Sequence, residues 1–246
     1  MLLVFDVVGT VAHFRRFDTN SSSLTYHVPP RTAVAGMLGA VLGLSFAEVP
    51  AVFSTSRCRI GVALKVPVRT ITTTVNYLNT KKGVEDWHGH RFRTQVPVEW
   101  VLPAKGDVLR YGVFLVHEDD HLVRELYALT SQNRSRYPVY LGTAQCCAWV
   151  ENAVLYDGSD LEWSDCETEV VPVLSVVPLN RVLRVEAVPG TRVASDRVPV
   201  ELTPDRRLVS ATDVAWNPAG EPLWLQLRGD RFRPPGSDVW HVFVEP

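Results

Sequence analysis

The feature that most constrains this chain is an apolar, glycine-bearing segment with the spacing of a buried helix. Its apolar residues recur at intervals of three and four, as they do along one buried stripe, and Pro30 stands where a helix start tolerates proline. The segment therefore predicts a helix over residues 30–44. The stripe consists of Val34, Met37, Leu38, Val41 and Leu42.

Three glycines, Gly36, Gly39 and Gly43, gather on the face opposite that stripe. Each interior glycine costs about 1 kcal/mol of helix stability relative to alanine. If the helix only packed its apolar residues into the core, glycines on its opposite face would add no stability. We therefore expect a ligand or another backbone to approach that face closely, with packing by another segment of the same chain as the alternative.

Length and composition exclude several classes of protein. The chain has 246 residues, enough for one large or two small domains, and its 46 % hydrophobic content is typical of a globular protein. The apolar stretch 34–44 is too short to cross a bilayer, and the N-terminus lacks the basic region of a signal peptide, so we expect an intracellular protein with no membrane association. The 4 cysteines form no CxxC pair, which disfavours zinc and disulfides.

Charge is distributed unevenly although the net charge is only −2. Residues 57–110 contain ten Lys/Arg against four Asp/Glu, whereas residues 150–246 contain nine against sixteen. The basic middle predicts a surface for an anion. Because an acidic surface repels nucleic acid, we expect the C-terminal third to face protein neighbours.

The order of apolar runs predicts an α+β fold. Strand, loop, helix and strand are followed by a long insertion, and a strand, a second helix over residues 121–131 and a last strand around residues 139–154 complete the pattern. This order is typical of a ferredoxin-like or RNA-recognition-type (split βαβ) domain over residues 1–154, with a β-hairpin inserted at about 66–97. Residues 76–93 lack a strand period and read as a loop at its tip. Short Val/Leu runs between Pro, Gly and Asp turns predict a small antiparallel β region over residues 155–246.

Two groups of residues suggest RNA binding. Arg15 and Arg16 lie between aromatic residues and Arg31 lies near the helix start, so guanidinium groups for phosphates stand beside rings for bases; an exposed charged loop is the alternative. The insertion interleaves basic and aromatic residues, as single-stranded nucleic acid requires, with contact to a protein partner as the alternative. Its candidates are Lys65, Arg69, Tyr77, Lys81, Lys82, Trp87, His88, His90, Arg91 and Arg93.

Enzyme signatures are absent from the sequence. His88 and His90 have no third metal ligand at suitable spacing, so no metal or cofactor is expected. A metal-independent ribonuclease needs a base, an acid and a charge stabiliser at one 2′-OH. Residues of these types are present, but the sequence does not show that they converge. They are His13, Tyr26, His27, Lys81 and His88.

Three blocks of this sequence resemble the fifth family of CRISPR-associated proteins, the type I effector (Cascade) subunit that holds the 5′ handle of the guide RNA (crRNA). The first runs from Gly9-Thr-Val-Ala-His-Phe-Arg through Tyr26-His-Val-Pro-Pro-Arg-Thr-Ala-Val-Ala-Gly to the glycine-bearing helix. The second is the insertion, which resembles the family's thumb. The third is Arg136-Tyr-Pro-Val-Tyr-Leu-Gly-Thr-Ala-Gln-Cys.

The resemblance implies a cytoplasmic prokaryotic protein that contacts crRNA, the large Cascade subunit and the filament backbone subunit, and target DNA indirectly through the complex, in antiviral defence. It places Arg15, Arg16, Tyr26, His27, Arg31, Gly36 and Gly39 near the handle, and the insertion residues on the thumb. The family's nuclease branch has a Thr-Pro-Ser-Ala-x-x-Gly type motif where this chain has Pro29-Pro30-Arg31-Thr32-Ala33-Val34-Ala35-Gly36. We therefore expect a non-catalytic subunit, with a precursor-processing endoribonuclease or a protein-docking scaffold as alternatives.

Overall fold

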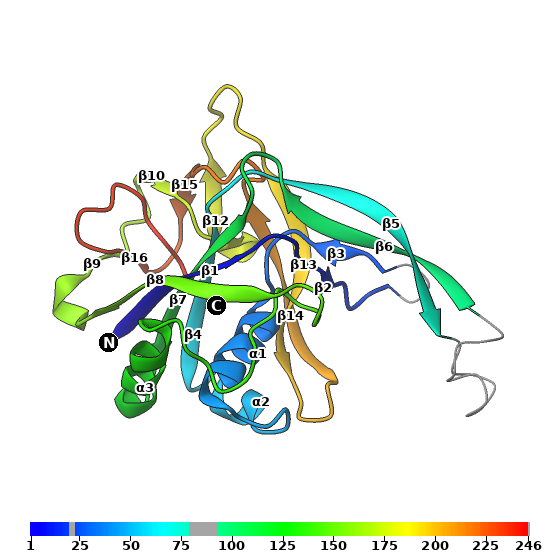
Figure 1. Ribbon diagram of the computed structural model, residues 1–246. Coiled ribbons are helices and arrows are strands. Elements are labelled where there is room, and N and C mark those ends of the chain that lie inside the picture. The colour runs from blue at the N-terminus through cyan, green and yellow to red at the C-terminus, as the bar shows by residue number, and fades with distance from the viewer. Residues whose placement is uncertain (20–22, 79–92, 246) are drawn as a thin grey trace.

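The structure is a computed structural model that describes residues 1–19, 23–78 and 93–245. It is an α+β protein built mostly from antiparallel strands with few helices, which confirms the predicted class (Figure 1). No helix among the described residues is long and apolar enough to cross a membrane.

A four-stranded sheet forms the centre of the N-terminal part. Its strand order is β4-β7-β1-β8, and every neighbouring pair is antiparallel. β1 is apolar at nearly every position because both faces of the sheet are covered. The last strand begins later than residue 139, where the sequence suggested it, because residues 137–143 form a loop instead. The strands are β1 (Leu2–Gly9), β4 (Cys58–Leu64), β7 (Leu109–His117) and β8 (Ala148–Tyr156).

Two helices connect these strands and share the main core with them. α1 (Arg31–Leu42) buries its apolar stripe and ends at Gly43, whose φ of 74° lets its N–H reach the last helical carbonyls. α3 (Asp120–Thr130) begins at Asp119, whose carboxylate accepts from the N–H of His121 at 2.9 Å. Both helices were predicted from their periodicity. A short helix, α2 (Val49–Val52), follows α1.

A long hairpin lies between β4 and β7 in the chain and projects from the body of the molecule (Figure 1). It pairs β5 (Val68–Leu78) with β6 (Arg93–Pro103) along their whole length. The strands reach further than the sequence indicated, because the backbone ladder continues through Tyr77, opposite Thr94, although the side chains there are polar. At its base, β6 bridges residues of the preceding loop, Ala12 with Val101 and Ser23 with Val98.

The remaining strands are antiparallel, as the turn-rich pattern predicts, and most are short, but β13 and β14 have 9 residues each. They form a β10-β15-β12 sheet, a β11-β14-β13 sheet and small pairs. In the N-terminal part these are β2 (Phe14–Arg15) and β3 (Thr25–Tyr26). In the C-terminal part they are β9 (Glu162–Ser164), β10 (Val170–Val173), β11 (Val177–Pro178), β12 (Val182–Val185), β13 (Ala194–Leu202), β14 (Leu208–Trp216), β15 (Leu223–Leu227) and β16 (Arg231–Arg233), with two 3-10 turns, η2 (Gly158–Asp160) and η3 (Leu179–Arg181).

The C-terminal region covers the sheet face that the helices leave free. Phe114 of β7 packs there against the rings of Phe232 and His241, at centroid distances of 5.6 and 4.1 Å. The edge of β4 is covered too, because the N–H of Val244 donates to the carbonyl of Ile60 at 3.0 Å. β13 and β14 contribute to the same core as α1. The two regions on either side of residue 154 are therefore joined by shared apolar packing.

His241 makes the stability of this packing depend on pH. Burial, with a smaller effect of the Lys65 charge, lowers its pKa from 6.5 to about 3. Between these values the unfolded chain binds a proton that the folded chain excludes, so the free energy of unfolding falls on acidification by up to about 1.4 kcal/mol per pH unit. Urea titrations at pH 7 and pH 5 should show this loss, and His241→Phe should reduce it. An equal loss in both proteins would contradict the assignment.

Candidate nucleic-acid interface

A groove of about 670 Å³ opens along the outward face of α1. Three separate parts of the chain form its walls: the segment around β2, the loop 137–143, and the end of β13 with the turn that follows it. The loop after α1 contributes an aromatic rim. Residues that line it include Arg15, Thr32, Ala33, Gly36, Met37, Ala40, Phe46, Tyr137, Tyr140, Leu202 and Arg206.

The glycines of α1 divide into two roles along this groove. Gly36 is exposed on its floor, and a Cβ added there meets no atom within 4 Å. Gly39 is buried, and an added Cβ would overlap Cγ2 of Val49. A glycine is needed at position 39 because Val49 of the same chain packs directly against the helix backbone there. Gly36 remains as the open position where a ligand could approach the helix backbone.

The loop 137–143 is fixed to α1 and to β2 by its backbone. The N–H of Tyr137 donates to the carbonyl of Ala40 at 2.9 Å, and the N–H of His13 donates to the carbonyl of Leu141 at 3.0 Å. Gly142 has a φ of +96°, and a Cβ there would overlap the carbonyl of His13. Only glycine therefore fits this crossing. Two sequence blocks that lie about a hundred residues apart interlock here to build one groove.

Aromatic side chains stand exposed at the rim. Phe46 and Tyr137 each keep 56 % of their surface open. Arg15 is also exposed on this side. Sequence reasoning missed Phe46 and Arg206, because a single aromatic residue in a loop and an arginine in an acidic region carry no pattern. It quoted Tyr137 only within the third block of the resemblance.

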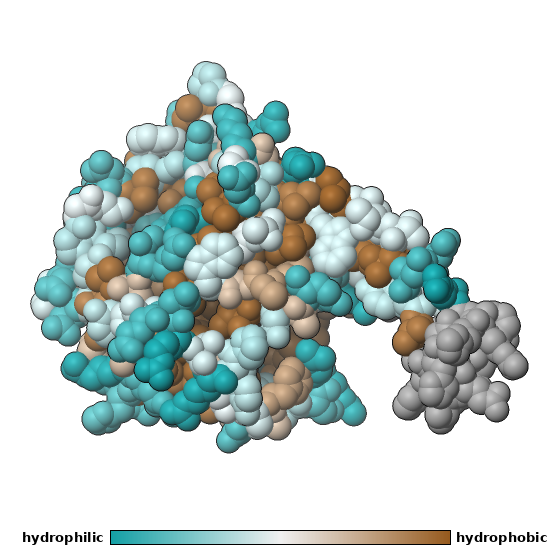
Figure 2. Space-filling view, in the orientation of Figure 1, coloured by the Kyte–Doolittle hydropathy of each residue, from teal (hydrophilic) through white to brown (hydrophobic). Residues whose placement is uncertain are grey.

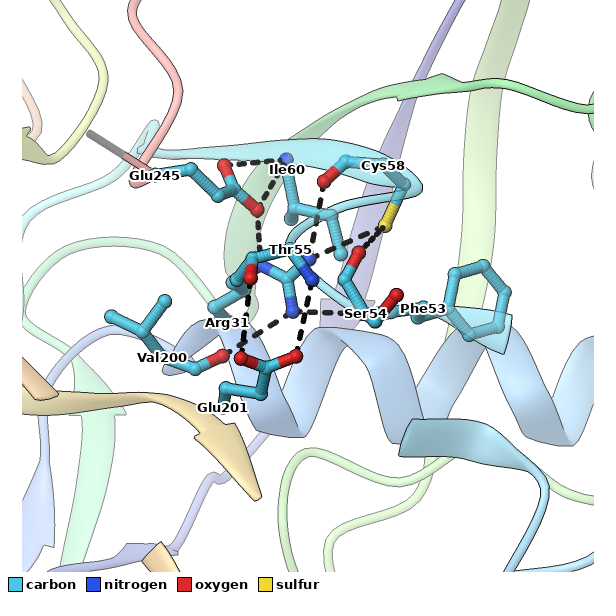
Figure 3. Close-up of polar contacts among 9 residues, drawn as sticks. All are labelled: Arg31, Phe53, Ser54, Thr55, Cys58, Ile60, Val200, Glu201 and Glu245. Carbon is cyan, nitrogen blue, oxygen red and sulfur yellow. Dashed lines mark hydrogen bonds and ion pairs between the residues drawn. The ribbon is translucent and has the colours of Figure 1, made fainter. Parts of the chain in front are cut away.

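Arg31 is not presented to a ligand, which corrects the prediction that it contacts RNA. Its side chain is 2 % exposed and forms an ion pair with the carboxylate of Glu245 (Figure 3). The remaining guanidinium donors reach the carbonyls of Phe53 at 2.9 Å, Cys58 at 3.2 Å and Val200 at 3.3 Å. Arg31 is therefore a structural residue: its buried contacts link α1 to β4, to β13 and to the C-terminal segment that carries Glu245.

Tyr26 and His27 are also withdrawn from the surface. Tyr26 is fully buried, its hydroxyl donates to the carbonyl of Arg197 at 2.8 Å, and burial raises its pKa to about 12. Its ring cannot stack on a base, which corrects the prediction for this residue. His27 is half-buried against the ring of Trp216, and burial lowers its pKa.

Two of the predicted cations are paired with carboxylates from segments that are distant in sequence, and so is Arg110, another cation of the basic middle region. Arg16 pairs with Asp196 at 2.7 Å, and Lys65 pairs with the buried Asp6 at 2.6 Å. Arg110 pairs with the same aspartate at 3.1 Å. The positive balance of residues 57–110 is therefore partly neutralised in the fold, which the linear charge count could not show.

The two described strands of the hairpin carry three of the residues predicted to bind RNA. Arg69, Tyr77 and Arg93 are exposed on its two strands. On one of its faces Ile71 lies opposite Trp100 and Val75 lies opposite Val96, and Arg69 and Thr73 share that face. Figure 2 shows single brown side chains among pale and teal ones along the hairpin. No cluster of metal ligands occurs among the residues that the structure describes. The predicted residues Lys81, Lys82, Trp87, His88, His90 and Arg91 lie outside the described residues.

Comparison with known proteins identifies the chain. The model of the family described as CRISPR-associated protein (Cas_Cas5) matches residues 2–162. The chain therefore belongs to the Cas5 family of CRISPR-associated proteins, as its sequence blocks suggested. No curated protein sequence matches it.

Solved structures share its fold at low sequence identity. A CRISPR protein from Archaeoglobus fulgidus superposes with a TM-score of 0.59 and 11 % identity, over 98 % of this chain and 99 % of that one. A chain of a CRISPR RNA-guided surveillance complex has a TM-score of 0.50 and 12 % identity, over 92 % and 91 % of the two chains. A chain of a Type III-B Cmr-beta complex bound to cognate target RNA has a TM-score of 0.50 and 10 % identity, over 90 % and 86 %. These matches extend the likeness in fold beyond the family-matched residues.

Proposed function

We propose that this chain is a non-catalytic RNA-binding subunit of a type I CRISPR Cascade complex and that its groove holds the 5′ handle of the crRNA. Membership in the Cas5 family supports a role as a CRISPR effector subunit. The observation that carries the proposal is the groove itself. The two blocks most typical of the family interlock to form it, and they leave Gly36 open on its floor.

The groove offers the chemistry that unpaired nucleotides require. Exposed rings such as Tyr137 provide faces on which splayed bases stack. Arg15 supplies donors for a phosphate, and the bare backbone at Gly36 permits close approach of the sugar–phosphate chain. This combination favours a single strand, because the rim presents separate rings on which unpaired bases can stack.

The strand order β4-β7-β1-β8, with α1 and α3 between its strands, supports assignment of residues 1–154 to a ferredoxin-like, RNA-recognition-type domain. Such domains commonly bind RNA on the sheet face that lacks helices. In this chain Phe232 and Phe243 occupy that face. We therefore assign RNA binding to the groove along α1 and not to the sheet.

The projecting hairpin would act as the family's thumb beside the handle. Its apolar face suits contact with a neighbouring subunit or with bases displaced from the guide. The large subunit and the filament backbone subunit are the proposed neighbours, with the acidic C-terminal region facing protein. Residues 1–154 would act as the RNA-recognition part and 155–246 as its β-rich extension.

The described residues give no support to the ribonuclease alternative. His13 is 3 % exposed and held between the carbonyl of Glu99 and the hydroxyl of Ser23, at 2.7 and 3.0 Å. Tyr26 is turned into the core. Two of the candidate residues, His13 and Tyr26, are therefore withdrawn from any open surface.

Incubation with full-length precursor repeat RNA in EDTA tests the proposal. We expect the protein, alone or in the assembled complex, to retain RNA that contains the handle and to leave it intact, with affinity that falls as salt rises. RNA of the same length without the handle sequence is the control. Cleavage at one site that disappears in His27→Ala would contradict a non-catalytic role.

A further inference from the structure

The turn between β13 and β14 reaches the mouth of the groove from the C-terminal region, beside α2 (Figure 1). Its backbone is fixed by Thr203, whose hydroxyl accepts from the N–H of Arg207 at 2.9 Å and donates to Asp205 at 2.6 Å. The N–H of Thr203 donates to the carbonyl of Arg207 at 2.9 Å. This turn is therefore a rigid support for the side chains it carries.

Two adjacent arginines in this turn have different surroundings. Arg207 is paired with Asp205 at 2.7 Å and has an 83 % exposed side chain. Arg206 instead lies over the ring of Phe46, with its guanidinium carbon 4.3 Å from the ring centroid. Arg206 lines the groove, and no ion pair of its side chain occurs among the described residues.

The backbone at Arg206 is unfavourable for this residue type. Its φ is +65°, a conformation that glycine and asparagine adopt readily and that an arginine adopts only at a cost. The turn itself requires this conformation, because the last residue of a three-residue hairpin loop that follows a type I turn is commonly left-handed. The turn therefore fixes where the backbone of Arg206 lies, and the contact with Phe46 fixes where its guanidinium group lies.

We propose that Arg206 and Phe46 form a clamp for one nucleotide of the bound RNA, with the guanidinium donating to a phosphate and the free face of the ring stacking on a base. This inference rests on the proposed RNA-binding function and adds the C-terminal region to the site, beyond the residues 2–162 that define the family. We expected the C-terminal third to face protein neighbours; under this proposal, the turn that carries Arg206 contacts RNA instead. An arginine can hold a phosphate and an aromatic ring at once, because its planar fork donates at the edge and stacks through its face.

Paired variants of the full chain test this clamp with handle-containing RNA. Arg206→Ala and Arg207→Ala remove the same charge from neighbouring positions. We expect Arg206→Ala to weaken RNA binding about fivefold and to reduce the slope of log affinity against log salt by about 0.7, the value for one phosphate of a single strand. Arg207→Ala should change neither quantity appreciably. Phe46→Ala should weaken binding by about five- to a hundredfold, through loss of one stacked base.

Arg206→Asn separates this role from folding, because asparagine suits the left-handed conformation. We expect an equal or higher Tm together with weaker RNA binding, a combination that a purely structural arginine would not show. If the unmodified protein binds handle RNA but Arg206→Ala and Arg207→Ala weaken this binding equally, the clamp is contradicted and the proposed function is not. Absence of RNA binding by the unmodified protein and its complex would overturn the proposed function instead.

Discussion

Arg31→Met is expected to lower the free energy of unfolding by about 3–5 kcal/mol, the range for breaking a buried ion pair from one side. The change leaves the carboxylate of Glu245, which is 4 % exposed, without its cation. It also removes the donors that serve three buried carbonyls (Figure 3). Urea unfolding at neutral pH measures the loss.

The double variant Arg31→Met/Glu245→Met is the control for this prediction. Removing both charges should restore part of the stability, because no buried charge is then left unpaired, while the three carbonyls and the N–H of Ile60 still lose their partners. RNA binding by the double variant should stay near that of the unmodified protein if Arg31 has a structural role. A stable Arg31→Met protein with weakened RNA binding would return this residue to the RNA site.

Gly36→Trp is expected to weaken binding of handle RNA by more than tenfold, since the side chain fills the floor of the groove. Folding should be almost unchanged, because a Cβ at this position enters open space and glycine is the poorer helix former by about 0.5 kcal/mol. Filter binding and thermal unfolding measure the two effects. Gly36→Ala should stabilise the helix by about 1 kcal/mol and leave RNA binding close to normal.

Gly39 provides the matched contrast on the same helix. Gly39→Ala places a methyl group against Val49, so it should destabilise the protein by about 1–3 kcal/mol, the usual cost of overpacking. Any loss of RNA binding should follow the loss of folded protein. Normal RNA binding by Gly36→Trp would mean that the open glycine is not part of the site.

Local patterns in the sequence were sufficient to predict the framework of the fold. The apolar stripe of α1, the apolar run of β1 and the turn-rich C-terminal strands are all set by neighbours in sequence, and the structure contains them. The ends of elements were less predictable. β5 continues through Leu78 because cross-strand pairing, and not side-chain alternation, decides where a hairpin ladder stops.

The candidate site was predictable only in part, because it depends on contacts between distant segments. The glycines of α1 lie on the side of the helix where the groove opens, but the sequence could not separate Gly36 from Gly39 without the position of Val49. Arg31 resembled a phosphate ligand until its partner, 214 residues away, was known. Arg206 had no signal at all, since its role depends on Phe46 across the groove.

Ultraviolet crosslinking of handle RNA to the assembled complex, followed by mass spectrometry of the crosslinked peptides, tests the central claim most directly. The groove predicts crosslinks at Phe46 and Tyr137 and none at Phe232, which covers the sheet face. Gly36→Trp complexes should lose the groove crosslinks. Crosslinks confined to peptides of the C-terminal sheets, such as the one that contains Trp224, would contradict the account.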